Sequence, residues 1–302
     1  MRPTIEDRKL YNVDYSKDTD FSAFARLLQS KWRAKKDLKE GKLGNFLDTD
    51  FSITSKANFL TENIKELVTR EISQSKSTGA LIKQPRIWNN LLSSQPLCFN
   101  LFGELHFDLE LATKFFGKLF PGKIETVTSI KFEYSPGRGN KQYIGDHSAF
   151  DVFIEYHNKG KNGFIGIEVK YAESLKEETK EMADKNFKDT YADLTKSCNL
   201  FKSDSLVQLR LPPFSQIWRD HLLAISIVKK HDYDEGFFVF LFPSKNSQCQ
   251  KGVDDYKTYL SFENEDKSMF SPRYLDDFIL TLRKLRNDTW TRELEDRYIG
   301  TV

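Results

Sequence analysis

Three charged side chains in the middle of the chain have the types and spacing of a metal-binding site. Asp151 lies in one apolar segment, and Glu168 and Lys170 lie two residues apart in the next apolar segment. If both segments are β-strands, Glu168 and Lys170 point to the same face, because side chains alternate along a strand. Buried carboxylates need a partner, and a pair of them suits a hard divalent cation such as Mg²⁺ that keeps several waters. A neighbouring lysine would stabilise negative charge or orient a water molecule.

The two segments are predicted to pair as a β-hairpin. If Tyr156 pairs with Gly163, the register places Asp151 opposite Glu168, at contact distance on one face of the sheet. Asp146 competes for the role of first acidic ligand, but its spacing does not place it across from Glu168. An exposed hairpin whose charged side chains form ordinary cross-strand pairs fits the same pattern. The residues alone therefore leave a metal site and a half-solvated hairpin as two open interpretations.

Further acidic candidates lie in the two elements that precede the hairpin. Glu104 follows Leu97 by seven residues, so it lies on the apolar side of a helix predicted over residues 94–121. Glu133 points away from the apolar face of a strand predicted over residues 125–134, and it is expected to share a face with the hairpin acids. A partly exposed position at the edge of the helix is the alternative for the first of these acids.

Polar and basic residues beside the hairpin are candidates for contacting a phosphate backbone. Arg138 and Lys141 lie in a loop that contains two glycines and a proline. Gln216 and Arg219 lie three residues apart near the start of a predicted helix, and are therefore neighbours on its surface. An ordinary surface turn and a structural salt bridge are the alternative explanations for the loop and for Arg219.

The elements that position these side chains follow the order helix, three strands, helices, strand. Hydrophobic periodicity predicts the type of each element, and glycine and proline mark several of the boundaries. The predicted elements are a helix over 94–121, a strand over 125–134, two hairpin strands separated by the polar residues 157–163, one long or two broken helices over 173–201, a helix over 214–230 and a strand buried on both faces over 236–243. This order predicts an α/β fold.

Helical segments are predicted on both sides of this core. We divide the chain into a helical N-terminal extension (1–90), a core (91–245) and a C-terminal helical extension (246–302). The C-terminal extension is either an accessory lobe or a surface for homodimer formation, and the sequence does not favour one of them.

The composition fits a packed globular protein. Of the 302 residues, 39% are hydrophobic and 14% are aromatic, which is enough for a full core. The formal net charge is only +2, so binding of a polyanion would depend on a local basic surface. Three widely spaced cysteines without a zinc pattern, and no apolar run of membrane-spanning length, lead us to expect a cytoplasmic protein with reduced thiols and no membrane segment.

The hairpin pattern resembles the PD-(D/E)xK nuclease superfamily, which has the restriction-endonuclease-like fold. Asp151 takes the first acidic position, and Glu168-Val169-Lys170 takes the E-x-K element on the next strand. The surrounding sequence, including GDHSAFDVFIEY and GFIGIEVKYAE, is similar to a group of uncharacterised bacterial nuclease-like proteins. The resemblance covers roughly residues 95–243 and implies an αβββαβ core with a mixed central sheet flanked by helices.

The resemblance also implies a Mg²⁺-dependent endonuclease of restriction type that hydrolyses phosphodiester bonds of DNA, with Mn²⁺ able to replace Mg²⁺. The metal ligands would be Asp151, Glu168 and the backbone carbonyl of Val169, with Glu104 or Glu133 as a further acidic ligand. The lysine of the E-x-K element would be the third catalytic residue. RNA is an alternative substrate. The alternative function is a non-catalytic protein of this fold that binds nucleic acid or a protein partner.

Overall fold

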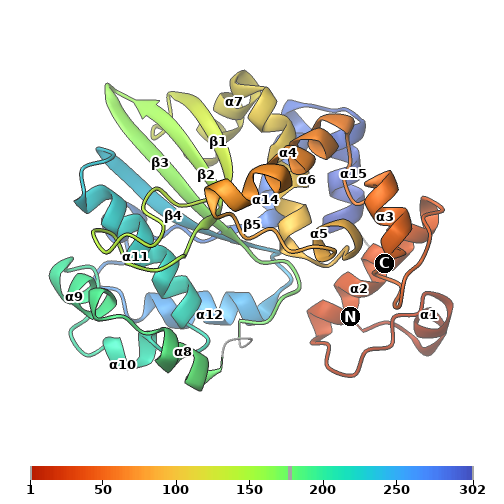
Figure 1. Cartoon of the computed structure of the whole chain (residues 1–302), viewed down its shortest axis with the longest axis horizontal. Coiled ribbons are helices and arrows are strands. Elements are labelled where there is room, and N and C mark those ends of the chain that lie inside the picture. Colours follow the sequence, from red (N-terminus) through yellow and green to blue (C-terminus); the bar gives the residue numbers. More distant parts are fainter. Residues whose placement is uncertain (1, 176–178, 301–302) are drawn as a thin grey trace.

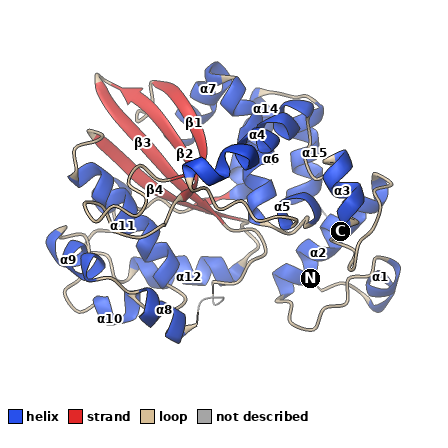
Figure 2. Cartoon of the chain, viewed as in Figure 1, coloured by secondary structure: helices blue, strands red, loops and turns tan. Residues whose placement is uncertain are grey.

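A mixed five-stranded sheet lies at the centre of the computed structural model, which describes residues 2–175 and 179–300 (Figure 1; Figure 2). The strand order is β1-β2-β3-β4-β5, in which β2 is antiparallel to both neighbours and β4 is parallel to both neighbours. The strands are β1 (Thr126–Tyr134), β2 (Phe150–Asn158), β3 (Lys161–Val169), β4 (Glu235–Phe242) and β5 (Arg273–Tyr274). The predicted α/β class is therefore confirmed.

Helices from both ends of the chain cover one face of the sheet (Figure 1). They pack in one hydrophobic cluster with strand side chains such as Val152, Ile167 and Val239. These helices are α2 (Asp20–Lys35), α4 (Glu62–Thr78), α5 (Arg86–Asn89), α6 (Ser94–Phe107), α7 (Leu109–Leu119), α14 (Leu275–Leu285) and α15 (Thr289–Tyr298). All three predicted segments of the chain thus contribute to a common core, and the division between them stays a prediction.

The opposite face is covered mainly by the connection from β3 to β4 and by the helix after β4. Phe153, Phe164 and Phe240 belong to this second cluster. The helices on this side are α8 (Lys180–Asn186), α9 (Asp189–Ser197), α10 (Leu206–Leu209), α11 (Ser215–Lys229) and α12 (Ser247–Lys257) (Figure 1). Side chains of β4 alternate between the two clusters, which confirms the prediction of a strand buried on both faces. Part of the predicted helical stretch 173–201 lies outside the described residues.

The remaining helices are short: α1 (Ile5–Leu10), α3 (Thr49–Ser55) and α13 (Glu265–Ser268). Within the described ranges, no helix combines the length and the apolar character that crossing a bilayer requires. The three cysteines, Cys98, Cys198 and Cys249, are free thiols.

The hairpin of β2 and β3 has the register predicted from the sequence, with Tyr156 paired to Gly163. The predicted polar break over 157–163 is wrong, because pairing continues as far as Asn158 and Lys161. The connection is a two-residue turn whose residues have φ angles of 50° and 79°. Two left-handed residues are what a tight type I′ turn needs, and their twist matches that of the strands. The polar residues therefore mark the exposed end of the hairpin rather than a loop.

The helix predicted over 94–121 is in fact two helices, because the chain bends at Asp108. This residue ends α6, and its side chain accepts a hydrogen bond from the Leu111 N–H at 2.9 Å, which caps α7. Aspartate is a favoured residue at a helix N-cap because its carboxylate binds the otherwise unpaired N–H groups of the first turn. The apolar periodicity continues across the bend and conceals it in the sequence.

Candidate active site

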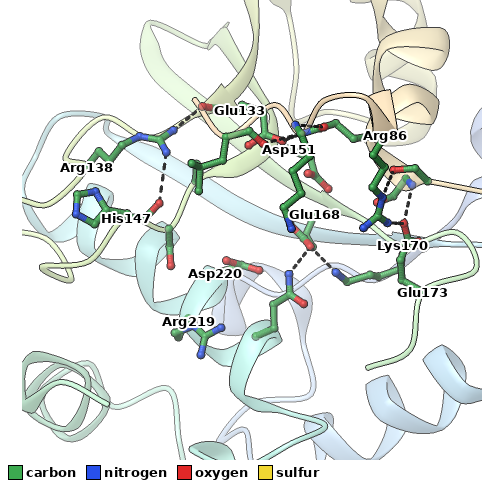
Figure 3. A pocket seen from close by; sticks show the side chains of 18 residues that line it. Arg86, Glu133, Arg138, His147, Asp151, Glu168, Lys170, Glu173, Arg219 and Asp220 are labelled. Atoms are coloured by element: carbon green, nitrogen blue, oxygen red, sulfur yellow. Dashed lines mark hydrogen bonds and ion pairs between the residues drawn. The ribbon is translucent and has the colours of Figure 1, made fainter. Parts of the chain in front are cut away.

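A polar pocket of about 350 Å³ opens between the site ends of β1, β2 and β3 and the helices α6 and α11 (Figure 3). Its lining includes Asp151, Glu168 and Lys170, the three residues predicted as catalytic, together with Glu133. The strands bring these side chains together from positions that are well separated along the chain. The predicted alternative of a solvated hairpin does not describe this site, because Glu168 is only 5% exposed.

Glu168 is held by two neighbours at the centre of the pocket. Its Oε1 accepts hydrogen bonds from Lys170 Nζ at 2.8 Å and from Gln216 Nε2 at 2.5 Å. Burial alone would lower the pKa of Lys170, but the carboxylate of Glu168 outweighs this effect and raises that pKa above its ordinary value. Lys170 therefore remains a cation beside Glu168 at neutral pH.

Asp151 lies next to Glu168, as the register of the hairpin requires. Its Oδ2 accepts a hydrogen bond from the Val169 N–H at 2.8 Å. Burial, followed by the nearby carboxylates of Glu168 and Glu133, raises the pKa of Asp151 well above its usual range. The Val169 side chain packs in the core cluster. The role of its carbonyl as a metal ligand stays a prediction.

Glu133 is the acidic residue that β1 adds to the pocket. Its φ angle is 47°, which is uncommon for a residue other than glycine and is a form of strain found at functional sites. The Glu133 carbonyl accepts a hydrogen bond from Arg138 Nη2 at 2.6 Å, and its Oε1 accepts one from Gln95 Nε2 at 2.5 Å. Burial raises the pKa of Glu133 to about 7, and Glu168 adds to this shift.

Glu104, the other acid suggested from the sequence, does not line this pocket. It is buried in α6, where its two oxygens accept hydrogen bonds from the Thr61 hydroxyl and, at 3.2 Å, from Asn63 Nδ2. Thr61 is the N-cap of α4 and accepts a hydrogen bond from the Ile64 N–H. A carboxylate at this place also interacts favourably with the positive end of the helix dipole. Of the two predicted acids, only Glu133 is therefore placed beside the predicted metal ligands.

The predicted phosphate-contacting residues divide into two groups. Arg138, Gln216 and Arg219 line the pocket, whereas Lys141 is exposed on the loop and is not among its lining residues. Gln216 is directed at Glu168, so it orients an acid of the site instead of facing an open surface.

Asp146, the alternative first acid, has a structural place outside the pocket lining. Its oxygens accept hydrogen bonds from the Ser148 N–H at 2.9 Å and from the Tyr191 hydroxyl at 2.5 Å. These bonds fix the chain that leads into β2. The preference for Asp151 over Asp146 agrees with this arrangement.

Three charged residues of the pocket were not identified from the sequence. Glu173 accepts hydrogen bonds from the Ser94 N–H at 2.7 Å and from Arg86 at 3.1 Å. It thereby joins the start of α6 to the end of β3, a contact between distant segments that the sequence does not reveal. Asp220 is buried and also lines the pocket. The available signal for Asp220 was its position four residues after Gln216, which is one helical turn.

The donor set of the pocket fits a hard divalent cation. Asp151, Glu168 and Glu133 supply carboxylate oxygens, the ligand type that Mg²⁺ prefers, and their crowding raises the pKa values of two of them. Among the described residues, no group of three or more His, Cys, Asp or Glu side chains is arranged to hold an ion by itself. A Mg²⁺ ion bound by one or two carboxylates and several waters does not require such a group.

Comparison with known proteins agrees with this geometry. The sequence profile of one family, described as the PD-(D/E)XK nuclease superfamily, matches residues 16–300. The match extends well beyond the core that the E-x-K pattern suggested and includes most of both flanking segments. Neither the curated proteins nor the solved structures gave a match to the chain. Members of this superfamily are generally nucleases and typically use divalent metal ions. With its mixed sheet between helices, the chain belongs to the PD-(D/E)XK nuclease superfamily.

Proposed function

We propose that the protein is a Mg²⁺-dependent nuclease that hydrolyses phosphodiester bonds of DNA. The observation that supports the proposal most strongly is the convergence of Asp151, Glu168 and Lys170 in one polar pocket of a nuclease-superfamily fold. A protein that only binds nucleic acid has no need for buried carboxylates at its binding surface, since they repel phosphate and are costly to bury. The combination of two acids and a lysine is the set that hydrolysis requires.

Each side chain has a distinct task in this proposal. Bound by Asp151 and Glu168, with the Val169 carbonyl as a further ligand, the divalent ion would polarise the phosphate and lower the pKa of an attacking water. Lys170 places a permanent positive charge where the phosphate gains negative charge. Gln216 and Lys170 together hold the Glu168 carboxylate in one orientation, which keeps its other oxygen available.

The rim of the pocket supports a polyanionic substrate. Lys83, Arg86, Arg138 and Arg219 line the pocket around the acids. They provide the local basic surface that a chain of nearly balanced charge needs in order to attract a phosphate backbone. DNA is the substrate that the resemblance to restriction-type enzymes favours.

A cleavage panel tests the proposal. Wild-type protein is incubated with supercoiled plasmid, linear duplex, single-stranded DNA and RNA, in Mg²⁺, in Mn²⁺ and in chelator. We expect metal-dependent cutting of at least one form of DNA, none by Asp151→Asn, and normal cutting by Asp193→Asn, which changes an exposed carboxylate on α9. Failure to cut any DNA in either metal would contradict the proposal. Cleavage of RNA alone would replace DNA as the substrate.

A further inference from the structure

One buried oxygen of the pocket has no partner. Asp220 on α11 is 4% exposed and lines the pocket. Its Oδ2 is shielded from solvent and has no hydrogen-bond partner in the part of the chain that the structure describes. Buried polar atoms are nearly always paired, and a carboxylate oxygen is especially costly to leave without a donor or a cation. This oxygen therefore points to a ligand that the protein chain does not supply.

The helix directs Asp220 at the same acid that the proposed catalytic site uses. Gln216 precedes Asp220 by one helical turn, so the two side chains lie on one side of α11, and Gln216 donates a hydrogen bond to Glu168. In Figure 3 the carboxylate of Glu168 lies between those of Asp151 and Asp220. The negative charge of Glu168 also raises the pKa of Asp220, after the larger effect of burial.

The rotation of α11 is fixed from its other side. His221 is completely buried, and its ring forms hydrogen bonds with the Tyr256 hydroxyl at 2.9 Å and with the Ser268 carbonyl at 2.7 Å. These two bonds prevent the helix from turning Asp220 away from the pocket. The unpaired oxygen is thus a feature of a constrained helix, which a side-chain rearrangement of Asp220 alone would not remove.

We infer that Asp220 and Glu168 bind a second divalent cation, next to the one assigned to Asp151 and Glu168. The inference rests on the proposed function, because it uses the same metal-binding acid. Two carboxylates with water ligands are sufficient for Mg²⁺ or Mn²⁺, and the cation would supply the missing partner of Asp220 Oδ2. Two cations that share one carboxylate can stabilise both the attacking and the leaving oxygen of a phosphate.

The number of bound ions tests the inference without measuring cleavage. Mn²⁺ binding is followed by calorimetry and by the magnetic resonance signal of free Mn²⁺. We expect two ions per wild-type chain and per Asp193→Asn chain, one ion for Asp220→Asn and one for Asp151→Asn. Asp220→Ser repeats the measurement with a smaller side chain in the event that the asparagine variant does not fold.

Thermal unfolding in chelator separates a metal ligand from a structural residue. Asn in place of Asp220 removes an unpaired buried charge, so the metal-free variant should melt at or above the wild-type temperature and gain less from added Mn²⁺. A lower melting temperature with both ions retained would overturn the inference. One ion on the wild type, with unchanged binding in Asp220→Asn, would overturn it while leaving the proposed nuclease intact. Wild-type protein that binds no Mn²⁺ would refute both.

Discussion

The acids of the pocket lie closer together than separate carboxylates in water would. Burial and mutual repulsion raise the pKa values of Asp151 and Glu133, and Lys170 is the cation in direct contact with Glu168. Without a bound cation this arrangement opposes folding, since charged forms are disfavoured in a low dielectric. Such a cost is expected where function rather than stability selects the residues.

Glu133 should make the stability of the metal-free protein fall as the pH rises. Its pKa is about 7 in the folded protein against an ordinary value of 4.5, so between these pH values the folded state binds more protons than the unfolded state. The free energy of unfolding in chelator should therefore decrease from about pH 4.5 to about pH 7, by roughly 3 kcal/mol at most from this residue. Urea unfolding of the wild type and Glu133→Gln measures the difference, and the variant should show a flatter profile.

The control for this prediction is Glu66→Gln, which changes an exposed carboxylate on α4 and should follow the wild-type profile. Parallel profiles for the wild type and Glu133→Gln would show that the Glu133 carboxyl is not perturbed as described.

Gln216 should affect cleavage through Glu168. Its amide donates to Glu168 Oε1 at 2.5 Å, so Gln216→Leu leaves this carboxylate less firmly oriented. Loss of such an orienting contact reduces metal affinity or activity by about 10- to 100-fold in metal sites. Single-turnover cleavage at several Mg²⁺ concentrations measures both effects. Gln250→Leu on α12 is the matched control, and equal rates for the two variants would argue against an orienting role.

At the scale of elements, the turn between β2 and β3 determines which side chains meet. Lys159 and Gly160 both have positive φ angles, and the resulting tight turn fixes the register that places Asp151 next to Glu168. A shift of one residue would move every side chain of a strand to the other face and separate these acids.

Gly160→Ala should therefore destabilise the protein through the backbone alone. Gly160 has a φ angle of 79°, and a Cβ atom at this position would meet nothing within 4 Å. The expected loss in the free energy of unfolding is about 1 kcal/mol, because alanine is strained in the left-handed region. Lys159→Gly at the neighbouring position should relieve strain and raise stability slightly. If Gly160→Ala is as stable as the wild type, the turn does not have this conformation.

The sequence predicted the register of the hairpin because its two strands alternate clearly and because the charged residues interrupt an apolar pattern at defined positions. It did not predict the bend at Asp108, since a capping carboxylate and a continuous helix show the same apolar spacing there. Periodicity also suggested Glu104 as a site residue, whereas its partners Thr61 and Asn63 belong to a distant helix. Roles that depend on contacts between distant segments, such as that of Glu173, could not be read from spacing.

At the scale of the whole molecule, the two flanking segments join each other beside the core. Arg297 on α15 is completely buried, and its guanidinium donates hydrogen bonds to the Asn58 carbonyl at 2.7 Å and to Gln29 Oε1 at 3.0 Å. The guanidinium also lies 4.3 Å from the centre of the Trp32 ring. The chain ends therefore stabilise one another while they cover the sheet.

Arg297→Met should lower the free energy of unfolding by about 3 kcal/mol, because it leaves buried oxygens without donors. The loss should appear in a single cooperative transition, since the segments share one hydrophobic cluster with the sheet. Urea unfolding followed by circular dichroism and by tryptophan fluorescence measures both quantities. Arg292→Met, an exposed position on the same helix, is the control. Two separate transitions in the wild type would contradict a shared core.

The most direct measurement of the proposed chemistry is the single-turnover rate of DNA cleavage at saturating Mg²⁺ for the wild type, Lys170→Met and Lys131→Met. Lys131 is a suitable control, because it also pairs with a glutamate on the sheet, at 2.8 Å from Glu155, but does not line the pocket. We predict that Lys170→Met is slower by about 100- to 1,000-fold, that Lys131→Met equals the wild type, and that chelator stops all three. A Lys170→Met rate equal to that of the wild type, or cleavage that persists in chelator, would contradict a metal-dependent centre at Asp151, Glu168 and Lys170.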